Sequence, residues 1–162
     1  MDRTNWMLGY FSINFLVLSI VRQKTAFPML WLFLPKKGNS NTKERIQLIE
    51  PFLYIFGNHK IEYLTADREF IGEAWFRYLI EQHIKFRLRI KKNMKLSRTH
   101  GKLSPAVNFF RSLPASTACS LPDRRWVCGQ GWPNPRHNLL WVTGMRLASG
   151  DYLIMVSHDE SD

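Results

Sequence analysis

Two aspartates, Asp2 and Asp67, are the residues whose settings could support chemistry. Asp67 follows a short apolar run at residues 61–66, which predicts a strand, and Asp2 opens the first predicted strand. In open α/β sheets, ligands gather at the carboxyl ends of parallel strands, and Mg²⁺ prefers oxygen ligands such as carboxylates. If the two strands are neighbours, the two acids could share a metal ion. The alternatives are that Asp67 only caps a turn and that Asp2 is solvated near a frayed terminus.

A basic strand is the second candidate site. Within residues 84–91, large apolar side chains alternate with cationic ones, which predicts one buried face and one basic face. No acidic residue occurs from residue 82 to residue 122. Such a surface could neutralise DNA phosphates, and the alternative is a solvated charged face. The residues assigned to this DNA-binding surface are Lys85, Arg87, Arg89, Lys91 and Lys92.

The composition of the chain agrees with a polyanionic partner. Its 162 residues are 45% hydrophobic, enough for a core. The formal net charge is +10, which favours nucleic acid or an anionic membrane surface as partner. The two cysteines match no zinc or redox motif, so a reducing cytoplasm is the expected location. The apolar runs at residues 13–21 and 26–34 are shorter than the roughly 20 residues that a spanning helix needs, so no membrane span is expected.

The first elements that must position these residues are strands near the start of the chain. Residues 4–34 are rich in β-branched and large apolar side chains and predict three strands. The apolar runs at residues 13–21 and 26–34 predict two buried strands joined by a polar turn. Pro28, near the start of the last of these, is compatible with a sheet edge or a bulge.

Helices should separate the following strands. Asn41 and Glu44 have the spacing of a capping box, so a helix is expected to begin there and to end at Gly57, with Pro51 kinking or interrupting it. A second helix is predicted at residues 72–82. Helices between strands imply crossover connections and parallel pairing. The expected fold class is α/β, a mixed sheet flanked by helices.

The pattern changes after residue 92. Residues 93–122 are basic, rich in Ser and Pro and weakly periodic. Residues 139–147 and 152–157 predict two further strands, and residues 149–151 predict a hairpin turn between them.

Four segments carry a resemblance to a known family. They are residues 1–6 (MDRTNW), 34–45 (LPKKGNSNTKER), 64–72 (LTADREFIG) and 86–93 (FRLRIKKN). These segments resemble bacterial insertion-sequence transposases of the DDE class, and the most similar group is the "insertion sequence four" family. The resemblance is good over residues 1–93, and its most specific block is DREFIG at residues 67–72. Residues 138–156 look like the β-rich insertion that these enzymes carry within their catalytic core.

The resemblance implies a ribonuclease-H-like fold, incomplete here, with residues 1–93 as a partial catalytic core and residues 94–162 as a β-rich insertion segment. It also implies that Asp2 and Asp67 are the first two acids of a catalytic triad, which binds two Mg²⁺ ions for DNA cleavage and strand transfer. The third acid of the family is a glutamate on a helix, in a Tyr…Arg…Glu…Lys signature. No such signature is found, and Glu160 lies in a polar tail. We therefore expect a fragment truncated at both ends and inactive by itself.

The partners that the resemblance implies are transposon-end DNA and, in the intact family enzyme, a second copy in a homodimer. Two other functions stay open. A non-catalytic basic nucleic-acid-binding module needs only the basic surface. A peripheral membrane protein needs an amphipathic helix with Lys and Arg along one face. The basic residues here lie on a predicted strand, which counts against the membrane alternative.

Overall fold

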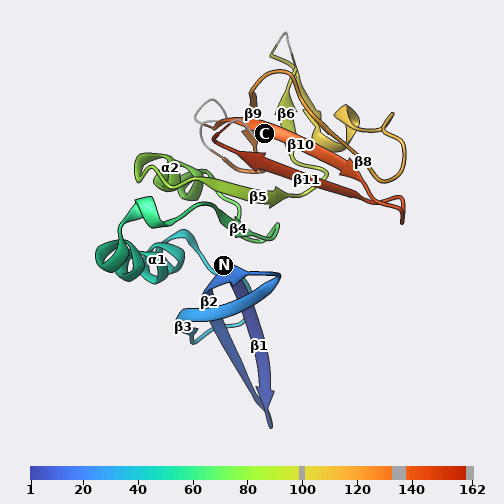
Figure 1. The fold of residues 1–162 in the computed structure, drawn as a ribbon. Helices are drawn as coiled ribbons and strands as arrows, with labels where there is room; N and C mark the ends of the chain where they lie inside the picture. The colour runs from blue at the N-terminus through green and yellow to red at the C-terminus, as the bar shows by residue number, and fades with distance from the viewer. Residues whose placement is uncertain (99–100, 133–137, 160–162) are drawn as a thin grey trace. The chain divides into compact units, whose positions relative to one another are not determined.

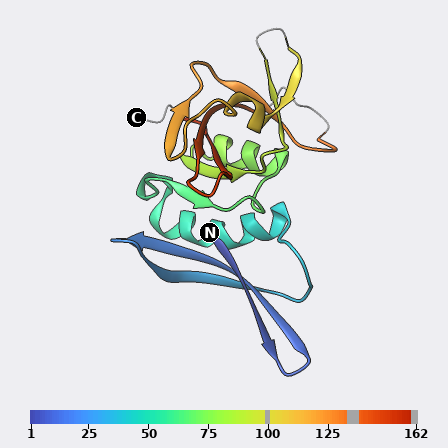
Figure 2. The same cartoon turned by 90° about the vertical axis from the view of Figure 1, so that its right-hand side faces the viewer.

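The chain folds into a strand-rich α/β structure in the computed structural model, which describes residues 1–98, 101–132 and 138–159 (Figure 1, Figure 2). It divides into two units, Met1–Glu62 and Tyr63–Asp162. The expected division at residue 93 into a core and an insertion stays a prediction, and Glu160 lies outside the described residues. Within the described ranges, no helix is long and apolar enough to cross a membrane.

The first unit begins with an antiparallel sheet in the order β1-β2-β3. Its strands are β1 (Asp2–Leu8), β2 (Phe11–Arg22) and β3 (Thr25–Leu34), which confirms the three predicted strands. A two-residue turn joins β2 to β3, and in it Gln23 and Lys24 take φ values of 50° and 66°. Positive φ at both positions is typical of the type I′ hairpin, whose twist matches that of the flanking strands.

Strand β3 lies at the edge of this sheet and leaves much of its surface exposed. The β2–β3 pairing shifts register next to Pro28, which confirms the predicted edge position or bulge at this proline. Leu34 is buried, but Trp31 and Phe33 are 66% and 52% exposed. The expectation of two buried strands is therefore wrong in part, because the face of β3 that holds Trp31 and Phe33 is open to solvent, and Ile20 near the end of β2 is 46% exposed as well.

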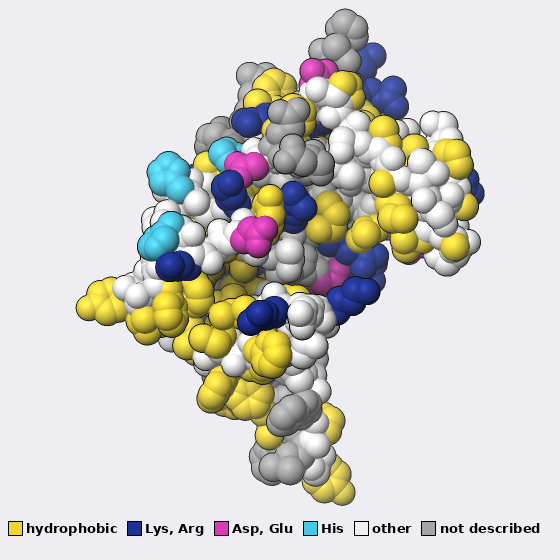
Figure 3. Space-filling model, viewed as in Figure 1, with side chains coloured by type: hydrophobic (Ala, Val, Ile, Leu, Met, Phe, Trp, Pro, Cys, Tyr) yellow, Lys and Arg dark blue, Asp and Glu magenta, His cyan; other side chains and the backbone are white. Residues whose placement is uncertain are grey.

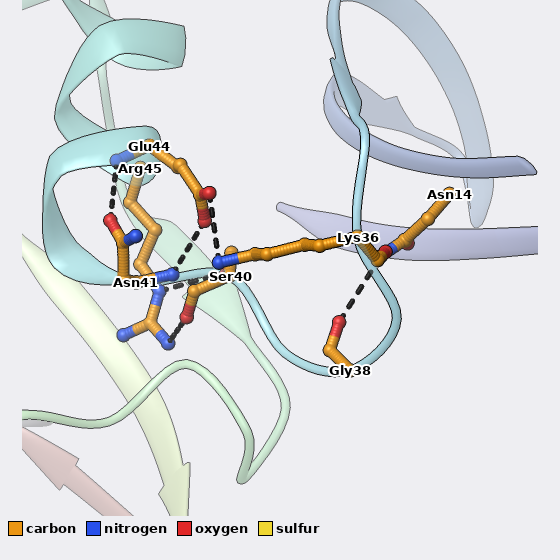
Figure 4. A network of polar contacts seen from close by, with 7 residues as sticks. All are labelled: Asn14, Lys36, Gly38, Ser40, Asn41, Glu44 and Arg45. Atoms are coloured by element: carbon orange, nitrogen blue, oxygen red, sulfur yellow. Dashed lines mark hydrogen bonds and ion pairs between the residues drawn. The ribbon is translucent and has the colours of Figure 1, made fainter.

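Helix α1 (Thr42–Phe56) begins and ends where the sequence predicts. The side-chain oxygen of Asn41 accepts a hydrogen bond from the Glu44 N–H at 3.0 Å, and the Glu44 carboxylate accepts one from the Asn41 N–H at 2.7 Å (Figure 4). This capping box satisfies two donors that a helix start leaves open. Burial raises the pKa of Glu44, but hydrogen bonds from Lys36 and Asn41 outweigh it and hold that pKa below its ordinary value.

Of the two effects predicted for Pro51, a kink or an interruption, the interruption does not occur, since α1 continues through this residue. A proline inside a helix lacks the N–H that would bond to the carbonyl four residues earlier, here that of Gln47. Both Pro51 and Gln47 are exposed, so water can satisfy this carbonyl. The helix ends at Gly57, whose N–H donates to the Leu53 carbonyl at 2.9 Å, and the short 3-10 helix η1 (Asn58–Lys60) follows.

Buried polar side chains anchor the loop between β3 and α1. Asn14 of β2 donates to the carbonyls of Lys36 and Gly38 at 3.2 Å and 3.1 Å. From the other side, Arg45 of α1 donates to the hydroxyl and the carbonyl of Ser40 at 3.0 Å and 2.6 Å. The loop is thus tied both to the sheet and to the helix (Figure 4).

The second unit opens with a crossover of β4 (Leu64–Ala66), α2 (Glu73–Glu81) and β5 (Phe86–Ile90). Strands β4 and β5 pair in parallel, which confirms the second predicted helix and the parallel pairing that a helix between strands implies. The rings of Phe76 on α2 and Phe86 on β5 stack with centroids 5.7 Å apart, so α2 covers one face of this sheet.

Later strands extend the same sheet, in the order β4-β5-β11-β10-β9-β6-β7, with β8 also paired to β10 (Figure 1). Strands β10 (Leu139–Arg146) and β11 (Tyr152–Ser157) form the predicted antiparallel hairpin. Between β5 and β10 lie short elements that the sequence pattern does not predict, because three or four residues show too little alternation. These are β6 (Lys95–Ser97), β7 (Leu103–Pro105), the 3-10 helix η2 (Ala106–Phe109), β8 (Thr117–Ser120) and β9 (Arg125–Cys128).

The core of the second unit lies on the sheet face that α2 and η2 cover. Trp75 of α2 and Leu88 of β5 are fully buried. Phe110, the residue after η2, is almost fully buried as well. The ring of Phe110 packs onto Gly144 of β10, where an added Cβ would come within 2.5 Å of the ring. The opposite face of β5 is therefore left to the polar and charged residues of the strand.

Candidate functional site

Asp67 directly follows β4, at the carboxyl end of the parallel pair β4 and β5. Its backbone carbonyl accepts a hydrogen bond from the Phe70 N–H at 2.9 Å, which closes the turn that leads toward α2. Its carboxylate is 55% exposed and lies 3.4 Å from Nη1 of Arg89 on β5. The residue therefore closes a turn with its backbone and still offers a carboxylate at the sheet edge.

Asp2 is the first residue of β1 and lies opposite Val17 of β2. Its exposed carboxylate accepts a hydrogen bond from the Arg3 N–H at 2.7 Å. Burial lowers the pKa of the Met1 terminal amine, and the negative charge of Asp2 opposes that shift without cancelling it. Strand β1 pairs with β2, whereas β4 pairs with β5, so Asp2 and Asp67 belong to different sheets and different units. A metal site shared by these two acids stays a prediction.

The described residues do not gather into a ready-made metal centre. No group of three or more His, Cys, Asp or Glu side chains that could hold a metal ion occurs among them. Asp67 still has the chemistry of a ligand for a hard cation, because its carboxylate is accessible and already faces a positive charge, that of Arg89. A divalent ion at Asp67 would have to compete with this guanidinium.

The basic strand has the predicted alternation. The apolar side chains of β5 are buried, and Arg87 and Arg89 are half-buried on the opposite face. The lysines before and after the strand, Lys85, Lys91 and Lys92, are exposed. The five residues assigned to DNA binding thus belong to one strand and its two ends.

Acids from distant parts of the chain partly neutralise this basic stretch. Lys85 lies 3.6 Å from the carboxylate of Asp159, and Lys92 lies 3.2 Å from that of Asp151, in addition to the ion pair of Arg89. Figure 3 shows Lys and Arg side chains standing among Asp and Glu on the face drawn there. Although residues 82–122 contain no acid, folding brings acids from other segments next to the basic residues.

Two arginines lie beside aromatic rings in contacts that no sequence motif predicts. The Arg87 guanidinium lies 4.0 Å from the centroid of the Tyr63 ring, next to β4. The Arg124 guanidinium lies 5.6 Å from the centroid of the Trp141 ring, on β10. Alternation within β10 could place Trp141 on one face, but strand pairing is needed to bring it onto the face that holds Arg87.

Comparison with known proteins relates the chain to transposases. A family model described as the transposase DDE domain matches residues 18–130, more than half of the chain. Among solved structures, the piggyBac transposase in a cryo-EM synaptic complex with hairpin DNA has a TM-score of 0.57 and 13% sequence identity, over 99% of this chain and 33% of that chain. This chain therefore spans about a third of the length of that transposase. No curated protein matches the chain.

These likenesses cover the candidate residues unevenly. The family match includes Asp67 and the basic strand β5 but begins after Asp2. The structural likeness agrees with the strand-rich α/β fold. The ribonuclease-H-like detail of the fold and the catalytic role of the two acids stay predictions.

Proposed function

The chain belongs to the transposase DDE domain family, and from this premise we propose that it is part of a cut-and-paste DNA transposase. The proposal is carried by the family match over the segment that sets Asp67 at the carboxyl end of β4, beside the basic strand β5. The similar solved structure is a transposase in complex with hairpin DNA, which supports DNA as the partner of this chain. Membership of the "insertion sequence four" family and a cytoplasmic location are parts of the same proposal.

Asp67 and Asp2 are the proposed ligands of a divalent metal ion, with Mg²⁺ as the physiological ion. When bound, such ions supply Lewis-acid activation of the attacking oxygen and stabilise the leaving oxygen in phosphodiester chemistry. Asp67 suits the role because its carboxylate is half exposed at the carboxyl end of a parallel strand. Asp2 suits it because its carboxylate is exposed at the start of β1. Carboxylates also stay ionised near neutral pH and can offset the charge of the metal.

Lys85, Arg87, Arg89, Lys91 and Lys92 form the proposed DNA-binding surface. Lys91 and Arg87 form no ion pair within the described part of the chain, so a phosphate would displace no carboxylate from either of them. The other three would exchange a carboxylate partner for a phosphate on binding. Phosphate contacts of this kind position DNA but do not read its sequence.

The 162-residue chain by itself is proposed to cleave DNA poorly. Asp2 and Asp67 are the acids proposed as metal ligands, and the resemblance implies a third in the family, a glutamate, to which no residue is assigned here. Complete activity, and the homodimer expected of the intact enzyme, would then require residues beyond those assigned here.

Metal-dependent binding of duplex DNA tests the proposal. Anisotropy of a labelled duplex would be measured in EDTA and in Ca²⁺, which supports metal-mediated contacts without cleavage. We expect Ca²⁺ to tighten binding and Asp67→Asn to remove this gain while keeping the affinity in EDTA. The matched control is Asp123→Asn, because Asp123 also lies beside an arginine, at 3.7 Å from Arg125.

Two outcomes would redirect the assignment. Equal affinity in EDTA and Ca²⁺, unchanged by Asp67→Asn, would favour the non-catalytic basic binding module, which needs only the surface of β5. Robust nicking of supercoiled plasmid in Mg²⁺ or Mn²⁺ that Asp67→Asn removes would support the site and overturn the proposal that the chain is inactive by itself.

A further inference from the structure

Strand β3 forms one edge of the sheet in the first unit and has no charged residue to protect it. Within the described residues β3 pairs with β2 alone, so its other side offers backbone N–H and C=O groups to a further strand. Natural proteins commonly place charged side chains on such edges, because an open edge can pair with another chain. Residues Thr25–Leu34 include no charged side chain, whereas the opposite edge strand, β1, begins with Asp2 and Arg3.

An apolar face adjoins this open edge. Trp31 pairs with Val17 of β2 and Phe33 pairs with Phe15, so these four side chains lie on one face of the sheet. The rings of Phe15 and Phe33 meet edge to face, with centroids 5.7 Å apart. Trp31 and Phe33 are nevertheless 66% and 52% exposed, although Leu34, on the other face, is buried. The edge of β3 therefore combines unpaired backbone groups with exposed aromatic rings.

The regular part of β3 is short, and this limits which partner strand fits it. The register between β2 and β3 shifts next to Pro28, which also has no N–H to donate. The regular edge therefore covers residues 30–34. A second copy of this segment, placed antiparallel and centred on Leu32, would set Trp31 of each copy opposite Phe33 of the other. Aromatic pairs in this arrangement stabilise antiparallel sheets, so the segment is complementary to itself.

The exposed area fits a second copy bound as a weak dimer. With about 200 Å² for a whole aromatic side chain, Trp31 and Phe33 leave about 240 Å² in solvent in each copy. Two copies bring up to about 500 Å² of aromatic surface to the contact, and the backbone edges add to it. Stable interfaces bury about 1,200–2,000 Å² in total, and transient ones bury less. A dissociation constant in the micromolar range is therefore expected.

We propose that two copies of this chain associate through their β3 edges, in an antiparallel pairing centred on Leu32. The strands β1-β2-β3 of one copy then continue into β3-β2-β1 of the other as a single sheet. Trp31 and Phe33 of both copies form one aromatic row across the contact, on the sheet face opposite Leu34. The inference concerns assembly and does not depend on DNA binding, so it goes beyond the proposed function.

Sedimentation equilibrium of the full chain tests this pairing. Concentrations from about 1 µM to about 200 µM bracket a micromolar dissociation constant. We expect the average mass to rise with concentration from 19.1 kDa toward twice that value. Higher salt should strengthen the association, because each copy carries a net charge of +10 and salt screens the repulsion between copies. Binding to DNA changes in the opposite direction with salt.

A charge placed on the edge should prevent the pairing. We expect Trp31→Lys to weaken dimerisation at least about tenfold, because the contact would bury an unpaired charge. The matched control is Tyr10→Lys, which makes the same kind of change in the turn between β1 and β2, away from the β3 edge. Tyr10 is fully exposed, and Trp31 is largely so, which means that neither change removes a buried side chain. Tyr10→Lys should leave the dimerisation constant unchanged.

Mixing two variants tests the register. Phe33→Glu by itself should also weaken dimerisation at least about tenfold. In the proposed register, position 31 of one copy faces position 33 of the other. An equimolar mixture of Trp31→Lys chains and Phe33→Glu chains therefore brings opposite charges together and restores one pair of aromatic rings. We expect the two variants to bind each other at least about fivefold more tightly than either binds itself.

Four results would count against the pairing. A chain that stays at 19.1 kDa at the highest concentration would overturn it, and the β3 edge would then be open to a different partner. Growth beyond two copies would also overturn it, because a two-fold contact closes after two chains. Equal weakening by Tyr10→Lys would show an effect of general charge. A mixture that gains nothing would reject the register centred on Leu32. DNA binding is measured separately and stands or falls by its own result.

Discussion

Asp67 and Arg89 form the contact that decides how available the candidate metal ligand is. The two side chains are 55% and 28% exposed, and the atoms that face each other are 3.4 Å apart. Ion pairs at this level of exposure contribute about 0–1 kcal/mol, because water screens them and both side chains lose freedom. Arg89 is thus a weak internal competitor for the position of a divalent cation.

Replacing Arg89 should expose this competition. We expect Arg89→Gln to raise the affinity for Mn²⁺ by up to about fivefold, the equivalent of a pair worth about 1 kcal/mol. Asp67→Asn should lower Mn²⁺ affinity instead. Free Mn²⁺ would be followed by electron paramagnetic resonance during titration. Arg125→Gln, which removes the partner of Asp123, is the control, and an effect as large as that of Arg89→Gln would contradict a specific role for Asp67.

At the scale of elements, α1 and β10 are held by different kinds of contact. The start of α1 depends on contacts within a few residues, since Asn41 and Glu44 bond to each other's backbone and Lys36 reaches Glu44 at 2.8 Å. Strand β10 depends on a distant residue, because Phe110 fills the space above Gly144. The stability of the start of α1 should therefore depend on charge, and that of β10 on side-chain volume.

The charge of Glu44 should make α1 sensitive to acid. Its pKa in the folded chain is below the ordinary 4.5, so its stabilising effect is complete above that value and is lost as the pH falls through the folded pKa. We expect Glu44→Gln to lower the free energy of unfolding by up to about 1 kcal/mol at neutral pH and to make no difference in strong acid. Urea unfolding followed by circular dichroism at a series of pH values measures this. Glu50→Gln, which changes an exposed acid of the same helix, should show no such pH dependence.

A methyl group at position 144 should disturb the packing of β10. Gly144→Ala would set a Cβ within 2.5 Å of the Phe110 ring, and overpacking of this kind costs about 1–3 kcal/mol. Thermal unfolding would show it as a lower midpoint. The cost should shrink when Phe110 is also changed to Leu, and an equal cost in both backgrounds would mean that the ring is not the obstacle.

At the scale of the whole molecule, the net charge of +10 is not concentrated on β5. Three of the five cations assigned to that stretch have carboxylate partners, from residues 67, 151 and 159. In the proposed complex with DNA, the attraction would therefore be the sum of many cations at intermediate distances, together with the few that touch phosphate. Measuring the affinity at several salt concentrations separates these contributions. Contacts that release counterions make log K fall more steeply with log salt concentration.

Charge reversal on β5 should reduce the salt dependence of duplex binding. The slope of log K against log salt concentration is about −0.9 per phosphate contact. Arg87→Glu with Arg89→Glu should weaken binding and make the slope shallower by about 2, the loss of two contacts. Arg77→Glu is the control, since Arg77 lies on α2 and pairs with Glu81 at 3.8 Å. The same slope for the double variant and the unmodified chain would exclude β5 as the contact surface.

Much of the fold could be predicted because its signals are local. The capping box at residues 41–44, the alternation within β5 and the hairpin of β10 and β11 each depend on residues close in the chain. The short strands between residues 95 and 128 could not be found this way, since each owes its conformation to a partner strand. Helix α1 also continues through Pro51, because the exposed side of a helix lets water replace the missing bond.

The sequence by itself determined the chemistry that is present: a carboxylate after an apolar strand at Asp67, a cationic alternation on β5 and a family resemblance that the match over residues 18–130 supports. The tertiary structure decided which groups face one another. It set Asp67 against Arg89 and aligned Arg87 with Trp141 across three strands. Strand register and ion pairing join residues that are far apart in the chain. A local pattern of side chains does not encode which distant residues will meet.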